Sequence, residues 1–157
     1  MKRLLLAGLF LLLWIPQAAS GQTGSDPLVR GFTDGALEEI LRGFGYADVE
    51  VREPSESGTG SLRFMVEGAT VTLYNYADGD LQLWWGVVHP GCSLEAINEW
   101  NRTKRLSRAY LDDEGDPILE ADLLANAGIN KEMVQEFISV FSLSRGQYRA
   151  FIADRCN

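Results

Sequence analysis

Three short runs between residues 62 and 87 constrain the fold most, because each alternates apolar side chains with polar or aromatic ones. A period of two is typical of strands that rest one face on a core. Glu67-Gly68 fits a two-residue turn after the first run, and Ala77-Asp78-Gly79 fits a three-residue turn after the second. These turns predict an antiparallel sheet with its large aliphatic residues on one face. The predicted partners are Phe64 with Val71, Leu73 with Leu83, and Val71 with Trp85.

The other face of this predicted sheet combines aromatic rings, threonines and an arginine, a mixture typical of interaction surfaces. A second helical layer over that face, or aromatic pairing between neighbouring strands, would explain the same residues. We treat it as a candidate protein-binding face, with a homodimer through the sheet as one specific form. The binding residues proposed for it are Arg63, Met65, Thr72, Tyr74 and Trp84, and Thr70 and Gln82 share the face.

The stretch from Ser93 to Asp122 predicts a short helix and then a hairpin. Ser93 is a good N-cap, and Leu94, Ile97 and Trp100 recur at helical spacing on one apolar face. After residue 106 the period changes to two, and Asp113-Glu114-Gly115 fits a three-residue hairpin loop. That loop pairs Tyr110 with Ile118, Ala109 with Leu119, and Arg108 with Glu120.

Two more helices and another strand complete the predicted fold. Thr33 caps a helix that ends near Gly43, and the valines at 49 and 51 indicate a short strand. Asn130 caps a long final helix, which the polar segment 142–146 is expected to interrupt. The sequence therefore predicts an α+β domain in which helices pack on an antiparallel sheet, in the order α-β-β-β-(β)-α-β-β-α.

The N-terminus has the pattern of a secretory signal peptide. Lys2 and Arg3 precede an apolar run from Leu4 to Ile15, which is short for a membrane span, and small residues follow at 18–20. A short membrane anchor or a buried N-terminal helix is the alternative. We expect a signal peptide over 1–20, a flexible lead over 21–31 and a single domain over 32–157. The mature protein is then periplasmic or secreted.

The charge of the chain argues against two classes of partner. The formal net charge is −8, and cleavage after residue 20 would remove two cations and no acids, which gives −10. Binding to nucleic acid depends on lysine and arginine contacts with phosphate. We therefore expect no nucleic-acid partner, and no membrane partner in the mature form.

The two cysteines, Cys92 and Cys156, gain meaning from the predicted export, because disulfides persist in oxidising compartments. An intramolecular bond would join the last helix to the start of the middle helix. Two free thiols or an intermolecular bond are the alternatives. We favour the intramolecular bond.

No motif for catalysis or for a cofactor occurs in the chain. His89, the one histidine, has no acid or serine placed beside it by a motif, and Asn98 and Asn101 fit helix-end hydrogen bonds better than a ligand site. The acidic run Asp112–Asp116 would allow an enzyme that depends on a metal such as calcium, or on a small ligand. Turn chemistry explains the same acids. We therefore expect no enzyme and no cofactor.

The segment NEWNxxxRLSRAYLDDEGDPILEADL, residues 98–123, resembles the YbjN family of bacterial proteins, often described as sensory transduction regulators. The resemblance continues through ANAGIN and the helix after it, and fades before about Leu62. It implies a fold like that of type III secretion chaperones and a protein-binding module without known catalysis. It supplies no catalytic or ligand residues. We therefore expect a non-catalytic exported protein-binding module, regulatory or chaperone-like, whose partner the sequence does not identify.

Overall fold

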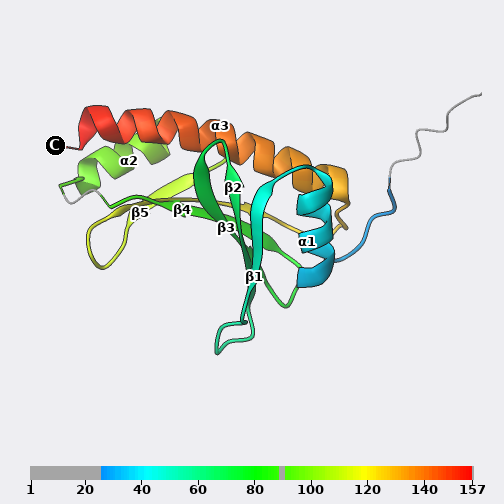
Figure 1. Cartoon of the computed structure of the whole chain (residues 1–157). Helices are drawn as coiled ribbons and strands as arrows, with labels where there is room; N and C mark the ends of the chain where they lie inside the picture. Colours follow the sequence, from blue (N-terminus) through cyan, green and yellow to red (C-terminus); the bar gives the residue numbers. More distant parts are fainter. Residues whose placement is uncertain (1–25, 89–90, 157) are drawn as a thin grey trace, which may run out of the picture.

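The computed structural model describes residues 26–88 and 91–156, so the predicted signal peptide lies outside the described residues. Within these residues, three helices and six strands follow one another in the predicted order, with the optional fourth strand present (Figure 1). The α+β prediction is confirmed. The elements are α1 (Asp34–Gly43), β1 (Ala47–Arg52), β2 (Gly60–Val66), β3 (Ala69–Asn75), β4 (Leu81–Gly86), α2 (Leu94–Thr103), β5 (Arg108–Leu111), β6 (Pro117–Leu123) and α3 (Lys131–Arg155).

The strands form one antiparallel sheet in the order β1-β2-β3-β4-β6-β5. Phe64 lies opposite Val71 and Leu73 opposite Leu83, as the turns predict. The hairpin of β5 and β6 also has the predicted register, including Arg108 opposite Glu120. The hairpin joins the other four strands through a pairing between residues distant in the sequence. β4 pairs with β6 and not with β5, the next strand along the chain.

All three helices pack on one face of this twisted sheet (Figure 1). Their buried residues join one core cluster with alternate residues of the strands, among them Leu73 and Leu83, which are fully buried. On α2 the predicted apolar face is correct for Ile97 and Trp100 but wrong for Leu94, which is 68% exposed. Ala96 is buried in its place. Leu94 is the first residue after the cap, where the helix is only beginning to meet the sheet.

The final helix runs without a break, so the predicted interruption at 142–146 is wrong. Ser142 donates to a Glu67 carboxylate over 2.7 Å, and the hydroxyls of Ser144 and Ser107 lie 2.6 Å apart. Arg145 is 4% exposed and reaches the carbonyl of Val66. These polar side chains hydrogen-bond across to the sheet end and the segment beside it, so they do not end the helix.

Residues 26–31, the last part of the predicted lead, lie against the domain. Val29 and Ile129 exchange backbone hydrogen bonds of 2.8 and 2.7 Å. The amine of Lys131 lies 2.7 Å from a carboxylate oxygen of Asp26. This part of the chain is therefore anchored beside the start of α3.

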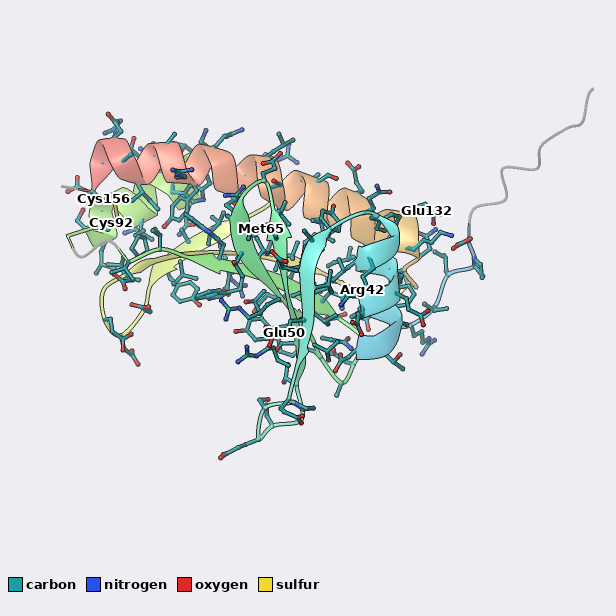
Figure 2. The ribbon with its side chains drawn as sticks, viewed as in Figure 1. Arg42, Glu50, Met65, Cys92, Glu132 and Cys156 are labelled. Atoms are coloured by element: carbon teal, nitrogen blue, oxygen red, sulfur yellow. A yellow bond between two sulfur atoms is a disulfide. The ribbon has the colours of Figure 1, made fainter. Side chains whose placement is uncertain are left out.

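A disulfide joins Cys92 to Cys156 across a sequence separation of 64 residues. Figure 2 shows the two cysteines where the start of α2 meets the end of α3. The bond therefore fixes the helical layer at one end of the molecule. Among the described helices, none is both long and apolar enough to cross a membrane.

Candidate protein-binding face

The sheet face away from the helices, which we call the open face, is organised in rows that cross the strands. One row follows the register through all six strands. Such neighbours on one face have side chains close enough to interact. The row consists of Glu50, Arg63, Thr72, Trp84, Glu120 and Arg108, in spatial order.

The structure brings together the five residues that the sequence proposes for binding. Thr72 lies between Arg63 and Trp84 in the row, and Tyr74 and Met65 lie two residues to either side along β3 and β2. Arg63 is exposed, and the other four are half-buried. A second helical layer would bury these residues, but all three described helices lie on the opposite face.

The aromatic part of the face extends onto the hairpin. The indole nitrogen of Trp84 donates to the hydroxyl of Tyr110 over 3.3 Å. A Cβ on Gly86 would come within 2.9 Å of the Trp84 ring and 2.5 Å of Ile118, so glycine allows the ring to lie close to the strand. Burial raises the pKa of the Tyr110 hydroxyl, and the nearby charge of Glu120 raises it further. Tyr110 is therefore protonated at neutral pH.

A polar network covers the rest of the β4, β6 and β5 part. Arg108 hydrogen-bonds Glu120 and lies 3.3 Å from a carboxylate oxygen of Asp122. The hydrogen bond with Glu120 raises the pKa of the Arg108 guanidinium. Gln82 donates to the other oxygen of Asp122 over 2.9 Å and accepts from the Tyr76 hydroxyl over 3.0 Å. Charges in this part of the face are therefore satisfied within the molecule.

The part of the open face on β1 to β3 is different, because one of its two arginines, Arg63, has no ion pair with any described residue. Arg63 lies opposite Glu50, yet the Glu50 carboxylate is 3.3 Å from Arg52. Among the described residues, Arg63 has no hydrogen bond or ion pair through its side chain. Its guanidinium is free to bind an acidic group from outside.

Sequence reasoning missed the hairpin's share of this face: Arg108, Tyr110, Glu120 and Asp122. The alternation of polar and apolar residues in the hairpin does indicate that Arg108 and Tyr110 lie on the side away from the core. No local sequence pattern, however, indicates that β6 lies beside β4. The pairing of these two strands brings the hairpin next to Trp84.

The acidic hairpin loop is explained by its own hydrogen bonds. One carboxylate oxygen of Asp112 accepts from the amides of Glu114 and Asp116, over 3.1 and 2.8 Å. In the described part of the chain, no group of three or more acidic, cysteine or histidine residues is arranged to hold a metal ion. Asn101 exchanges hydrogen bonds of 2.9 and 2.8 Å with the backbone of Ala109. His89 lies outside the described residues.

A family model described as "Putative bacterial sensory transduction regulator" matches residues 33–153. The chain belongs to the YbjN family. The match begins with the cap of α1, well before the point at which the resemblance in the sequence was expected to fade. No curated protein shows significant sequence similarity to the chain.

Among solved structures, this YbjN-family chain is similar to the crystal structure of the Yersinia pestis type III secretion chaperone SycH, in complex with a stable fragment of YscM2. The two share 15% sequence identity and a TM-score of 0.48, over 71% of this chain and 98% of that chain.

Proposed function

We propose that this YbjN-family protein is a non-catalytic protein-binding module of the bacterial envelope, regulatory or chaperone-like, and that its partner binds the open face. The observation that carries the proposal is the part of that face on β2 and β3. Partly exposed aromatic and apolar side chains lie there beside Arg63, whose guanidinium is unpaired among the described residues. The helices of the described residues all pack on the other side of the sheet.

This composition fits protein recognition for physical reasons. Aromatic residues, methionine and arginine are enriched at protein interfaces, and a few such residues carry most of the binding free energy. Tyr74 and Trp84 supply rigid apolar area, and Arg63 supplies a charge that gains when a carboxylate pairs with it. The expected partner therefore places an acidic group against β2 and an apolar surface against β3 and β4.

The test is recovery of a partner from periplasmic extract by tagged variants at equal folded concentration. The double variant Tyr74→Ala/Trp84→Ala should lose the protein that the wild type recovers. Leu94→Ala is the matched control, because Leu94 is an exposed apolar residue on α2. Equal recovery by the double variant and by the control would remove the open face as the binding site.

A homodimer through the open face is one form of this function. Light scattering on the purified protein measures the molar mass in solution. A dimer that Arg63→Glu and Tyr74→Ala both convert to monomer would place a second copy on this face. A wild-type monomer would leave only a different protein as the partner.

Export is the second part of the proposal. It is supported by the Lys2-Arg3 start, the apolar run to Ile15 and the small residues at 18–20, and a Cys92–Cys156 disulfide suits an oxidising compartment. Intact-mass analysis of the protein from cell fractions is the test. A periplasmic or secreted chain that begins near Gly21 and has no free thiols is expected. A full-length chain with two free thiols in the cytoplasmic fraction would contradict export.

A further inference from the structure

A groove of about 620 Å³ lies between the end of β6 and the side of α3, away from the centre of the open face. One wall is a stripe of α3 that includes Met133, Phe137 and Val140, at the spacing of one helix face. Leu106 and Leu124, both more than 60% exposed, stand at its rim. Apolar groups that are this exposed and this close together mark a site of interaction.

The other wall of the groove is the edge of a strand. β5 pairs with β6 only as far as Arg108 opposite Glu120, whereas β6 continues to Leu123. Leu106 has a φ of 66°, a left-handed conformation that is rare for a bulky residue and that ends the extended course of β5. Among the described residues, the end of β6 therefore has a neighbouring strand on one side only, which is β4.

The hydrogen-bond pattern shows which backbone groups this leaves open. The amide of Asp112 donates to the carbonyl of Asp116 over 3.0 Å, so these two residues form a hydrogen-bonded pair of the hairpin. In an antiparallel ladder every second residue faces the same neighbour, so Ile118 and Glu120 face β5 in the same way. Asp122 is the next in that series. Its amide and carbonyl point to the side where β5 is absent.

The outer edge of β5 itself is treated differently. There the side chain of Asn101 accepts from the amide of Ala109 and donates to its carbonyl. Asn101 thus protects the edge of β5, whereas no described residue hydrogen-bonds the neighbouring edge of β6 at Asp122, beside the apolar wall. Edges of the second kind are templates for pairing with another chain.

The charges that line the groove determine which peptide side chains it favours. Its lining carries three carboxylates, on Glu120, Asp122 and Glu136, against the single guanidinium of Arg108. Glu120 and Asp122 are already bound to Arg108. Glu136 is exposed and forms no ion pair with any of the described residues.

We propose that this groove binds an extended peptide segment of another protein, which adds as a strand to the edge of β6 at Asp122. Its alternate apolar side chains enter the groove, and a lysine or arginine pairs with Glu136. Recognition of this kind takes affinity from backbone hydrogen bonds and specificity from side-chain pockets. A second copy fits poorly, because a two-fold pairing of β6 edges would bring the acids of both copies together.

This inference goes beyond the function proposed above, since the groove is a surface distinct from the Arg63–Trp84 part of the open face. The probe is a fluorescent peptide of alternating valine and threonine with a lysine near each end, titrated against the mature protein and followed by anisotropy. Two further peptides carry N-methyl groups on alternate amides, one on each edge of the extended chain.

Binding by the unmodified peptide is expected, with one N-methylated series weakened roughly tenfold and the other unchanged, because only one peptide edge faces Asp122. Glu136→Lys should weaken binding roughly fivefold. Glu39→Lys, the same charge change on the exposed side of α1, should leave it unchanged. Tyr74→Ala should also leave it unchanged, which separates this site from the one proposed on the open face.

Three results would overturn the proposal. The first is no binding by the unmodified peptide at concentrations up to about 1 mM. The second is equal weakening by the two methylated series, or by Glu136→Lys and Glu39→Lys. The third is a dimer in light scattering that Glu136→Lys dissociates and Tyr74→Ala does not, because a second copy would then occupy the edge beside the groove.

Discussion

The two faces of the sheet are built from alternate residues of the same strands, yet their environments are opposite. Leu73 and Leu83 on the helical face are fully buried, whereas their neighbours Thr72 and Trp84 on the open face keep contact with solvent. Burial of apolar area makes the helical face the source of stability. The open face buries less apolar area, which agrees with the binding role proposed for its aromatic and charged residues.

The open face is itself divided. Side chains on β4, β6 and β5 hydrogen-bond one another, from Tyr76 through Gln82 and Asp122 to Arg108. Arg63 on β2 has no such partner among the described residues. One part of the open face therefore holds its own side chains in place, whereas Arg63 in the other part has no ion pair with a described residue.

The largest expected effect concerns the helical layer and its disulfide. Cys156→Ser should lower the free energy of unfolding by about 4 kcal/mol, the loop-entropy value for a closed loop of this length. Chemical denaturation with and without reductant measures it. Cys92→Ser is the matched control and should give the same loss, and a reductant should then have no further effect. A loss below about 1 kcal/mol would mean that the helices stay in place without the bond.

The next prediction compares adjacent residues on the two faces. Leu83→Ala should cost about 3 kcal/mol, because it removes a fully buried side chain and leaves a cavity. Thr72→Ala on the open face should cost less than about 0.5 kcal/mol. Urea denaturation of both variants gives the values. Similar costs for the two would show that the open face is covered in solution.

A third prediction uses alkaline pH to compare two tyrosines. Burial raises the pKa of the Tyr148 hydroxyl on the helical face. Burial also raises the pKa of the Tyr110 hydroxyl, and the charge of Glu120 adds a smaller increase. A raised pKa means that the folded state holds the proton more tightly. The stability that this contributes is complete below pH 10, the unfolded value, and is lost as pH rises through the folded pKa.

The free energy of unfolding should therefore fall above pH 10, by up to about 1.4 kcal/mol per pH unit for each such tyrosine. Tyr148→Phe should remove more of this fall than Tyr110→Phe, because Tyr148 is fully buried and Tyr110 is 38% exposed. Denaturation at pH 9, 10 and 11 provides the comparison. If Tyr110→Phe removed more of the loss of stability above pH 10 than Tyr148→Phe, the hydroxyl on the open face would be the more buried one in solution.

The smallest expected effect lies within the open face. Arg108→Ala should cost about 1 kcal/mol, since it leaves the mostly buried carboxylate of Glu120 without its cation while the arginine itself is exposed. Arg63→Ala removes the same type of side chain at a position where no described residue pairs with it, so it should be near neutral. The double variant Arg108→Ala/Glu120→Gln should recover part of the loss. If both arginine variants lowered the free energy of unfolding equally, the two parts of the open face would not differ in how their charges are paired.

Local sequence patterns predict much of this fold. Turn residues such as Glu67-Gly68 and Gly115 set the hairpin registers, and the alternation of Leu62, Phe64 and Val66 sets the buried face. Caps at Thr33, Ser93 and Asn130 mark the helix starts, and each accepts a hydrogen bond from an amide three residues on. These features depend on residues a few positions apart, which is why the sequence predicts them.

The rest depends on distant contacts. The pairing of β4 with β6 brings Tyr110 beside Trp84, and no local pattern indicates which of the two hairpin strands takes that place. The segment around Ser144 reads as a break, but its hydroxyl and Arg145 have partners outside the helix. The left-handed Leu106 likewise has no signature, so the groove beside it was not predicted.

Cross-linking from the open face in living cells tests the central claim most directly. A photoreactive amino acid at Thr72, in the middle of the row from Arg63 to Trp84, should form a covalent adduct with a specific protein. The same amino acid at Glu39, exposed on α1, should not. Tyr74→Ala introduced beside the Thr72 probe should reduce the adduct. An adduct from Glu39 alone, or equal adducts from both positions, would contradict the open face as the binding surface.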